Sequence, residues 1–360
     1  MISIESIRDK VQKGLRVTDE DALFLFESKE LLEVGELAAL VNERKNGKRV
    51  FFNINRHINY TNICVKRCAF CAFSRKSGED GTYTLSLAEI TNRASEAQRQ
   101  GATELHIVGG LHPELPFDFY LDMLREVKSA APLLHIKAFT AVEIDHFSSI
   151  SGLAPVDVLA SLQKAGLGSL PGGGAEIFAP KVRQELCPEK ISGKRWLSIM
   201  EDAHRNGLRS NATMLYGHLE NYADRVDHLC RLRELQDRTG GFQAFVPLAF
   251  QPGNTRLWTA GMAGTTGMDD LKTLAVSRVY LDNFDTIKAY WVMLGEKIAQ
   301  IALSFGINDL DGTVIEEKIG HDAGASSPQS LGREEILCLI RKAGRLPVER
   351  DTLYRAVREY

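Results

Sequence analysis

The segment Cys64-Val65-Lys66-Arg67-Cys68-Ala69-Phe70-Cys71 places three of the chain's six cysteines within eight residues. It directly follows the β-rich run Val50–Tyr60. The other cysteines, Cys187, Cys230 and Cys338, stand singly along the chain. This distribution does not suit a disulfide framework, and a tight cysteine cluster in a reducing compartment favours metal or redox chemistry.

Three interpretations of the cluster are open. A structural zinc site needs four closed ligands, usually in two pairs, and His57 is the only nearby candidate for the fourth. Iron–sulfur clusters are commonly held by four cysteines, so three would leave one iron open for another ligand. The third interpretation is simple packing of three small side chains. We favour a three-cysteine iron–sulfur cluster with Cys64, Cys68 and Cys71 as the metal ligands.

On both sides of the cluster, strand-like and helix-like patterns alternate from about residue 50 onward. The predicted strands are Val50–Tyr60, Glu104–Val108, His135–Thr140, Gly168–Leu170, Ser210–Leu215, Gln243–Leu248, Ile287–Met293 and Asp309–Ile315. The helices between them are Leu87–Gln100, Phe117–Ala130, Pro155–Ala165, Ala179–Glu185, Gly193–Asn206, Tyr222–Arg238 and Met268–Asp282. Eight such alternations predict an α/β fold, a (β/α)8 TIM-type barrel with the cysteines at its C-terminal mouth. An open doubly wound sheet is the alternative, although no Gly-x-Gly-x-x-Gly motif follows the first strand.

Helical segments are expected to flank the barrel. In the first of them, Thr18 followed by Asp21 predicts a helix N-cap. The segment Arg333–Tyr360 predicts a helix, a break at Gly344 and a second helix. The glycine-rich stretch Gly261–Gly267 is expected to be a flexible loop, either a lid or a plain connection. We predict three parts: an N-terminal helical segment, 1–48; the barrel, 49–320; and a C-terminal helical extension, 321–360.

Composition limits the class of protein. The chain has 360 residues, 44% hydrophobic and 25% charged, which is ordinary for a globular protein. The formal net charge of −3 gives no basic excess for nucleic acid or an anionic membrane. No apolar run approaches the roughly 18 residues that cross a bilayer, and early charges argue against a signal peptide. We therefore expect a cytoplasmic protein without a nucleic-acid or membrane partner.

The Cys-x-x-x-Cys-x-x-Cys spacing, with Phe70 just before the last cysteine, resembles the radical S-adenosylmethionine (SAM) superfamily. In that family the open iron of a 4Fe–4S cluster chelates SAM. Electron transfer then cleaves SAM to methionine and a 5′-deoxyadenosyl radical, chemistry that belongs to the cofactor. The resemblance implies both cofactors, a role for Phe70 beside SAM, and an unidentified low-potential electron donor such as flavodoxin or ferredoxin.

The resemblance also points to further SAM-binding residues. Gly109 and Gly110 end the second predicted strand, where missing side chains let the backbone approach a ligand; an ordinary tight turn is the alternative. Glu176 follows three glycines and could accept hydrogen bonds from ribose or the SAM ammonium, unless it is a solvated helix-start residue.

An arginine facing the methionine carboxylate is expected in the same family. Arg195 has the matching position, and a guanidinium suits a carboxylate. Arg183 and Lys190 are rivals for this role, and a surface position for Arg195 is the alternative.

Candidate substrate contacts are His57, Lys137, His218 and Arg256. His57 and His218 lie near the ends of the first and fifth strands and could orient a carboxylate or relay a proton. Structural histidines are the alternative. Lys137 lies on the third strand and could face the lumen. The catalytic residues themselves stay unknown, because the resemblance implies a radical generated at the cluster.

The stretch Asn53–Cys64 resembles the radical enzymes of the menaquinone and deazaflavin pathways as a group. Three further stretches resemble the aminofutalosine synthase family more closely: His135–Ile144, Cys187–Ser192 and Arg209–His218. The implied reaction is a radical SAM transferase reaction of menaquinone biosynthesis. The 5′-deoxyadenosyl radical adds to 3-[(1-carboxyvinyl)oxy]benzoate, and aryl migration and decarboxylation then give 6-amino-6-deoxyfutalosine. The related dehypoxanthine futalosine cyclase, which abstracts hydrogen, is one alternative. A non-catalytic iron–sulfur or zinc protein is another.

Overall fold

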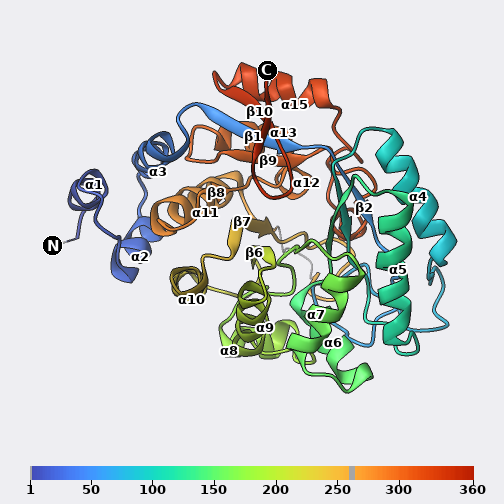
Figure 1. Cartoon of the computed structure of the whole chain (residues 1–360). Helices are drawn as coiled ribbons and strands as arrows, with labels where there is room; N and C mark the ends of the chain where they lie inside the picture. Colours follow the sequence, from blue (N-terminus) through green and yellow to red (C-terminus); the bar gives the residue numbers. More distant parts are fainter. Residues whose placement is uncertain (1, 259–263) are drawn as a thin grey trace.

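The computed structural model describes residues 2–258 and 264–360 (Figure 1). Its central sheet is parallel, with seven strands in the order β2-β3-β4-β5-β6-β7-β8. The strands are β2 (Asn55–Ile58), β3 (Glu104–Ile107), β4 (His135–Ala138), β5 (Ser169–Leu170), β6 (Arg209–Tyr216), β7 (Phe242–Ala249) and β8 (Thr286–Ile287). Each strand pairs with the next one along the chain, because helices carry the chain back between them.

The segment that contains β9 (Asp309–Gly312) closes this sheet into a barrel. On one side the amide of Ala289 donates to the carbonyl of Asp309, at 2.9 Å. On the other side the amide of His57 donates to the carbonyl of Ile315, at 2.8 Å. The segment therefore lies between the last and first strands, which confirms the TIM-type barrel and excludes the open sheet.

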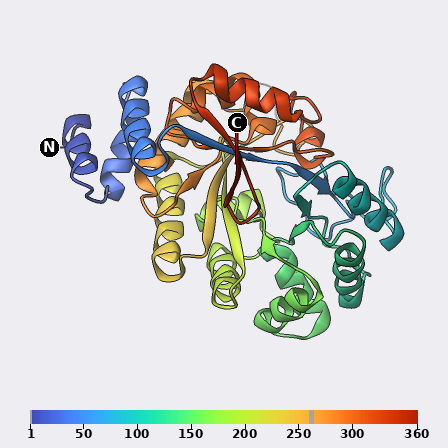
Figure 2. The same cartoon turned by 45° about the horizontal axis from the view of Figure 1, so that its top comes forward.

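A second sheet has the order β11-β10-β1-β9 and combines β1 (Arg49–Asn53) with β10 (Leu346–Arg350) and β11 (Ala356–Glu359). The predicted strand Val50–Tyr60 is therefore two strands in different sheets. The predicted second helix after Gly344 is wrong, because β10 pairs in parallel with β1 (Figure 2). Val348 of β10 is buried. The open edge of β1, which lies far away in sequence, determines this structure.

The outer helices agree with the expected pattern, apart from some ends. They are α4 (Leu87–Arg99), α5 (Phe117–Ala130), α6 (Ala141–Ser151), α7 (Pro155–Ala165), α8 (Pro180–Leu186), α9 (Gly193–Arg205), α10 (Tyr222–Thr239), α11 (Gly267–Tyr280), α12 (Trp291–Leu294), α13 (Glu296–Ala302), α14 (Ile319–Asp322) and α15 (Arg333–Lys342). The predicted strand Ile287–Met293 ends early, because α12 begins at Trp291. Helices α6, α12, α13 and α14 were not predicted.

The N-terminal helices are α1 (Ile4–Gln12), α2 (Asp19–Glu27) and α3 (Leu31–Asn46), and they lie beside the barrel (Figure 1). Helix α2 packs against α10 and α11, α3 packs against α11, and α1 packs against α3. The predicted N-cap is confirmed: Thr18 Oγ1 accepts from the amide of Asp21, whose carboxylate accepts from the amide of Thr18.

Among the described residues, no helix combines the length and apolar character needed to cross a membrane. The three-part division at residues 48 and 320 stays a prediction. The stretch Gly261–Gly267 lies partly outside the described residues.

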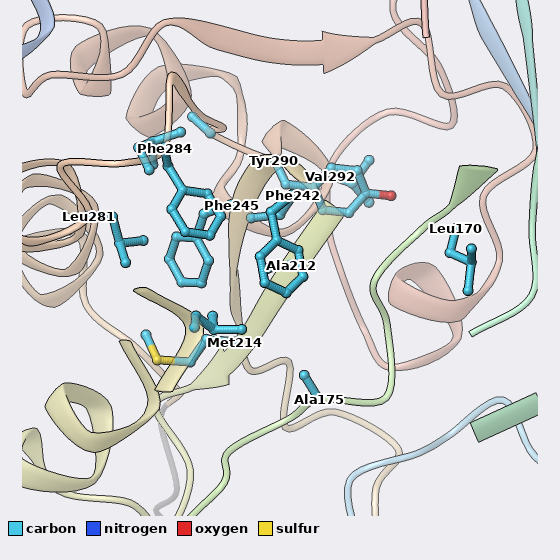
Figure 3. Packing of buried hydrophobic residues seen from close by; sticks show 14 of the residues in the cluster. Leu170, Ala175, Ala212, Met214, Phe242, Phe245, Leu281, Phe284, Tyr290 and Val292 are labelled. Atoms are coloured by element: carbon cyan, nitrogen blue, oxygen red, sulfur yellow. The ribbon is translucent and has the colours of Figure 1, made fainter. Parts of the chain in front are cut away.

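The apolar core lies between the sheet and the helices, not inside the barrel. Figure 3 shows Phe245 and Phe284 there, and their rings meet edge to face with centroids 6.4 Å apart. Strand β6 shows the division, because its side chains alternate between two faces. Ala212 and Met214 join the core, whereas the alternate residues Asn211, Thr213 and Leu215 line a cavity in the lumen. The fold thus leaves a partly polar lumen.

Candidate active site

The barrel holds a cavity of about 300 Å³, lined by side chains from β2, β3, β4, β6 and β7 and from the loops at their C-terminal ends. Cys64, Cys68 and Cys71 all line it. All three are free thiols, with Cys68 buried and the other two half-buried. Cys187, Cys230 and Cys338 do not line the cavity. The structure therefore brings together the three cysteines that the sequence singled out.

Backbone hydrogen bonds fix the loop that carries these thiols. The amide of Cys64 donates to the carbonyl of Arg75 at 3.0 Å, and the amide of Val65 donates to the carbonyl of Leu111 at 3.0 Å. The amide of Ala69 donates to the carbonyl of Leu186 at 2.9 Å. These bonds tie the loop to the segment after β3 and to the end of α8, so the protein itself preorganises the loop.

The donor set fits a multi-iron cluster. Within the described ranges, no three His, Cys, Asp or Glu side chains gather as ligands of a single metal ion. In a cubane cluster each thiolate binds a different iron, so the thiols need not converge on one point. His57, the fourth ligand considered for zinc, stacks on His106 with ring centroids 4.4 Å apart. Three free thiols on one cavity wall suit a 4Fe–4S cluster with one open iron.

Gly109 and Gly110 line the cavity beside the cysteine loop. A Cβ atom at Gly110 would lie 2.2 Å from the carbonyl oxygen of Ile63, and one at Gly109 would lie 2.7 Å from the ring of Tyr60. Side chains are therefore excluded at both positions, and the backbone forms the cavity wall.

Glu143, which the sequence analysis did not single out, holds this glycine turn. Its Oε1 accepts from the amide of Gly109 at 3.2 Å and from the hydroxyl of Tyr60 at 2.8 Å. Burial raises the pKa of Glu143 to about 7. The sequence did contain a signal for this residue, since Thr140 and Glu143 form a capping box at the start of α6.

Glu176 and Lys190 form an ion pair on the cavity wall. Lys190 Nζ lies 2.5 Å from Glu176 Oε1 and 5.0 Å from the centre of the Phe70 ring. All three residues line the cavity. Glu176 has a φ of 48°, a left-handed backbone conformation that is rare outside glycine and common at functional sites.

Arg195 does not line the cavity. It lies in the first turn of α9, where its Nε donates to Asp145 Oδ1 at 2.7 Å, and its side chain is 42% exposed. Arg183 is buried and donates to the carbonyls of Ala175 and Ile177, so it braces the loop after β5. Of the three candidate cations, only Lys190 reaches the cavity, and the structure gives the expectation for Arg195 no support.

The floor of the cavity is polar. His57, His106 and Lys137 occupy matching register positions on β2, β3 and β4, and all line the cavity. Lys137 faces the lumen but already donates to Glu104 Oε2 at 2.8 Å. Burial alone would raise the pKa of Glu104, but Lys137 and Lys288 outweigh it and hold that pKa below its ordinary value.

Two further lumen residues, Lys288 and Asp311, form an ion pair across β8 and β9. The sequence analysis missed both, and missed His106, because only strand parity places them inside. His218 and Arg256 are not among the lining residues. The ring of His218 contacts Glu220 and the carbonyl of Leu215 instead.

Comparison with known proteins agrees with this geometry. Residues 58–232 match the Radical SAM superfamily, and residues 239–359 match the CofH/MqnC C-terminal region. The chain is 48% identical to an aminodeoxyfutalosine synthase of Thermus thermophilus, covering 98% of this chain and 95% of that protein. It is 45% identical to a 5-amino-6-(D-ribitylamino)uracil–L-tyrosine 4-hydroxyphenyl transferase of Methanopyrus kandleri, covering 87% and 86%.

The fold itself has a counterpart among solved structures. The FeFe-hydrogenase maturase HydG of Carboxydothermus hydrogenoformans superposes with a TM-score of 0.76 at 19% identity, covering 98% of this chain and 80% of that one. One assignment follows from the barrel, from the three thiols that line one cavity, and from the 48% identity over 98% of this chain. The chain belongs to the radical SAM superfamily, within the family of the aminodeoxyfutalosine synthases, and is a radical SAM enzyme whose cofactors are a 4Fe–4S cluster and SAM.

Proposed function

We propose that this enzyme joins the 5′-deoxyadenosyl group of SAM to 3-[(1-carboxyvinyl)oxy]benzoate, giving 6-amino-6-deoxyfutalosine on the futalosine route to menaquinone. In this proposal the radical adds to the vinyl carbon, the aryl group migrates and the vinyl carboxylate is lost. The observation that carries the proposal is a single cavity with three thiols at its mouth and a hydrogen-bonding floor. The 48% identity to an aminodeoxyfutalosine synthase supports the choice of reaction.

The mouth residues have roles toward the cofactors in this proposal. Cys64, Cys68 and Cys71 hold the cluster, which supplies the electron that cleaves SAM. The backbone at Gly109 and Gly110 and the carboxylate of Glu176 accept hydrogen bonds from SAM. Lys190 replaces Arg195 as the cation toward the methionine carboxylate, and the Phe70 ring lies beside it.

The lumen positions the second substrate. Addition to an alkene requires the radical carbon to lie next to a fixed vinyl carbon, so orientation supplies much of the rate. His57 and Lys137 contribute polar groups on the floor, and Val246 and Leu248 contribute an apolar wall. The enclosed lumen keeps water away from a reactive radical.

A second candidate function comes from the relatives. The match to an L-tyrosine 4-hydroxyphenyl transferase at 45% identity favours a radical transfer reaction on a different aromatic substrate. The futalosine cyclase type of reaction, by hydrogen abstraction, is a further outcome that an assay must separate.

The deciding experiment is anaerobic reconstitution with iron and sulfide, followed by reaction with SAM, reductant and each candidate substrate. An adenosylated product from the enolpyruvyl benzoate supports the proposal. Free 5′-deoxyadenosine with a cyclised product means the cyclase, and consumption of tyrosine with the ribitylaminouracil means the transferase. Absence of methionine release would mean a non-catalytic iron–sulfur protein.

We also propose a cytoplasmic enzyme that receives its electron from a flavodoxin or ferredoxin. Replacing the chemical reductant by each reduced carrier tests this proposal. If neither carrier supports turnover, the proposal is wrong.

A further inference from the structure

Two stacked histidines form part of the cavity floor. His57 on β2 and His106 on β3 are register partners, and their ring planes lie within 10° of each other. Both line the cavity, and His57 is only 5% exposed. Among the described residues, Nε2 of His57 has no hydrogen-bond partner. A buried polar atom without a partner requires an explanation, and in a residue that lines a cavity a contact with the ligand supplies one.

Both imidazoles are neutral in the free enzyme near neutral pH. Burial lowers the pKa of His57, although Glu317, Asp311 and Glu104 partly oppose it. Burial also lowers the pKa of His106 well below its ordinary value, and His57 and Lys137 lower it further.

The charged groups that face the histidines are already paired with one another. The pairs are Glu104 with Lys137, Asp311 with Lys288 and Glu317 with His321. At the mouth, Lys190 is paired with Glu176 in the same way. The remaining lysine on the cavity wall, Lys66, belongs to the cysteine loop. A carboxylate that enters the floor would therefore add a negative charge, and the described part of the chain offers no unpaired cation on the floor to receive it.

We propose that the His57–His106 pair is the seat of one substrate carboxylate, and that binding draws one proton from solvent onto the pair. The protonated pair neutralises the incoming charge and donates a charge-assisted hydrogen bond, which is stronger than a neutral one. One proton is taken up and not two, because a second charge on the stacked ring would be repelled. This inference rests on the proposed function only in taking an aromatic carboxylate as the ligand.

The coupling fixes the sign of a pH dependence. The carboxylate raises the pKa of the pair, so the bound enzyme holds more protons than the free enzyme. Between the pKa of the free pair and that of the bound pair, affinity falls as pH rises, by up to about tenfold per pH unit. Without proton uptake, affinity would be flat over the same interval.

Calorimetry of the anaerobic holoenzyme tests the proposal. Benzoate and the enolpyruvyl benzoate are each titrated at pH 7.5 in phosphate and in Tris, whose ionisation enthalpies differ widely. The difference in binding heat gives the number of protons taken up, and we expect about one for each ligand. In His57→Gln and His106→Gln the uptake should disappear and affinity should fall at least tenfold.

His204→Gln is the matched control, because His204 lies outside the cavity against Phe242 and should leave uptake unchanged. Binding heat that is the same in both buffers for the wild-type enzyme overturns the inference without any variant, even if turnover is normal. If benzoate binds with proton uptake but the enolpyruvyl benzoate is not adenosylated, the proposed function fails and the carboxylate seat stands.

Discussion

The mouth and the floor of the cavity are built in opposite ways. The mouth consists of short contiguous segments: the cysteine loop, the turn Gly109–Gly110, and Glu176 with Lys190. The floor takes one side chain from each of several strands, including His57, His106 and Lys137. A local motif can be recognised wherever it occurs, whereas a floor exists only when the strands are in register. The residues for chemistry that a superfamily shares can thus lie in short segments, whereas the residues that select the substrate come from several strands of the barrel.

The first prediction breaks the mouth and has the largest expected effect. Cys64→Ala, Cys68→Ala and Cys71→Ala should each abolish turnover, because all three thiolates are needed to hold the cluster with a single open iron. Iron and sulfide content and methionine release measure this. Cys338→Ala is the control, since this residue is exposed and away from the cavity, and it should keep its iron. A single cluster-loop variant with a full cluster and near-native activity would contradict the ligand assignment.

The second prediction breaks the floor. Lys137→Met leaves the carboxylate of Glu104 buried without its partner and should destabilise the protein by about 3–5 kcal/mol. Thermal unfolding of the anaerobic holoprotein measures the loss. Because the pKa of Glu104 lies below its ordinary value, this stabilisation is present above the ordinary carboxyl pKa and is lost as pH falls toward the lowered one.

The double variant Lys137→Met with Glu104→Gln sharpens this second test. It removes the unpaired charge and should recover part of the lost stability. If the Lys137→Met protein is as stable as the wild type, the ion pair between Lys137 and Glu104 does not contribute to the stability of the protein.

The third prediction compares Glu176, which lines the cavity, with Arg195, which lies outside it. Glu176→Gln removes a charge-assisted contact to SAM and should cost about 1.5–3 kcal/mol, roughly ten- to hundredfold in affinity. The matched control is Arg195→Ala, which breaks an exposed pair with Asp145 and should cost less than about 1 kcal/mol. Titration of the reconstituted enzyme with SAM distinguishes them. Unchanged SAM affinity in Glu176→Gln, with a raised KM for the benzoate alone, would move Glu176 to the substrate side.

The fourth and smallest effect concerns the cavity rim, where Glu317 accepts from His321. This hydrogen bond raises the pKa of His321 to about 9. The stabilisation is therefore complete below the ordinary histidine pKa and is lost as pH rises through about 9. We expect the smallest of the four effects, because Glu317 keeps the amide of Gly320 as a donor when His321 is neutral. Melting temperatures at pH 6.5 and 9.5 should differ less in His321→Gln than in the wild type, and equal pH dependence in both would refute the assignment.

Much of the barrel could be predicted from the sequence. The strands Glu104–Ile107 and Arg209–Tyr216 and the helix Phe117–Ala130 follow from local periodicity, and their positions agree with expectation within one or two residues. The second helix after Gly344 was wrong for a physical reason. The segment Leu346–Arg350 is a strand because β1 offers it an open edge, and Arg350 there binds the buried Asp309. Neither partner lies near this segment in sequence.

The sequence by itself singled out the cysteine triad, because three thiols spaced closely along one loop can share a cluster, and the structure brings them to one cavity. It also determined the glycine turn at Gly109–Gly110, since a close backbone approach needs residues without side chains. Only the tertiary structure decided which cation reaches the cavity, Lys190 or Arg195, and which side chains form the floor. The direction in which a strand residue points depends on the register and curvature of the whole sheet. The charge balance around His57 and His106 arises from strands that meet only when the barrel closes.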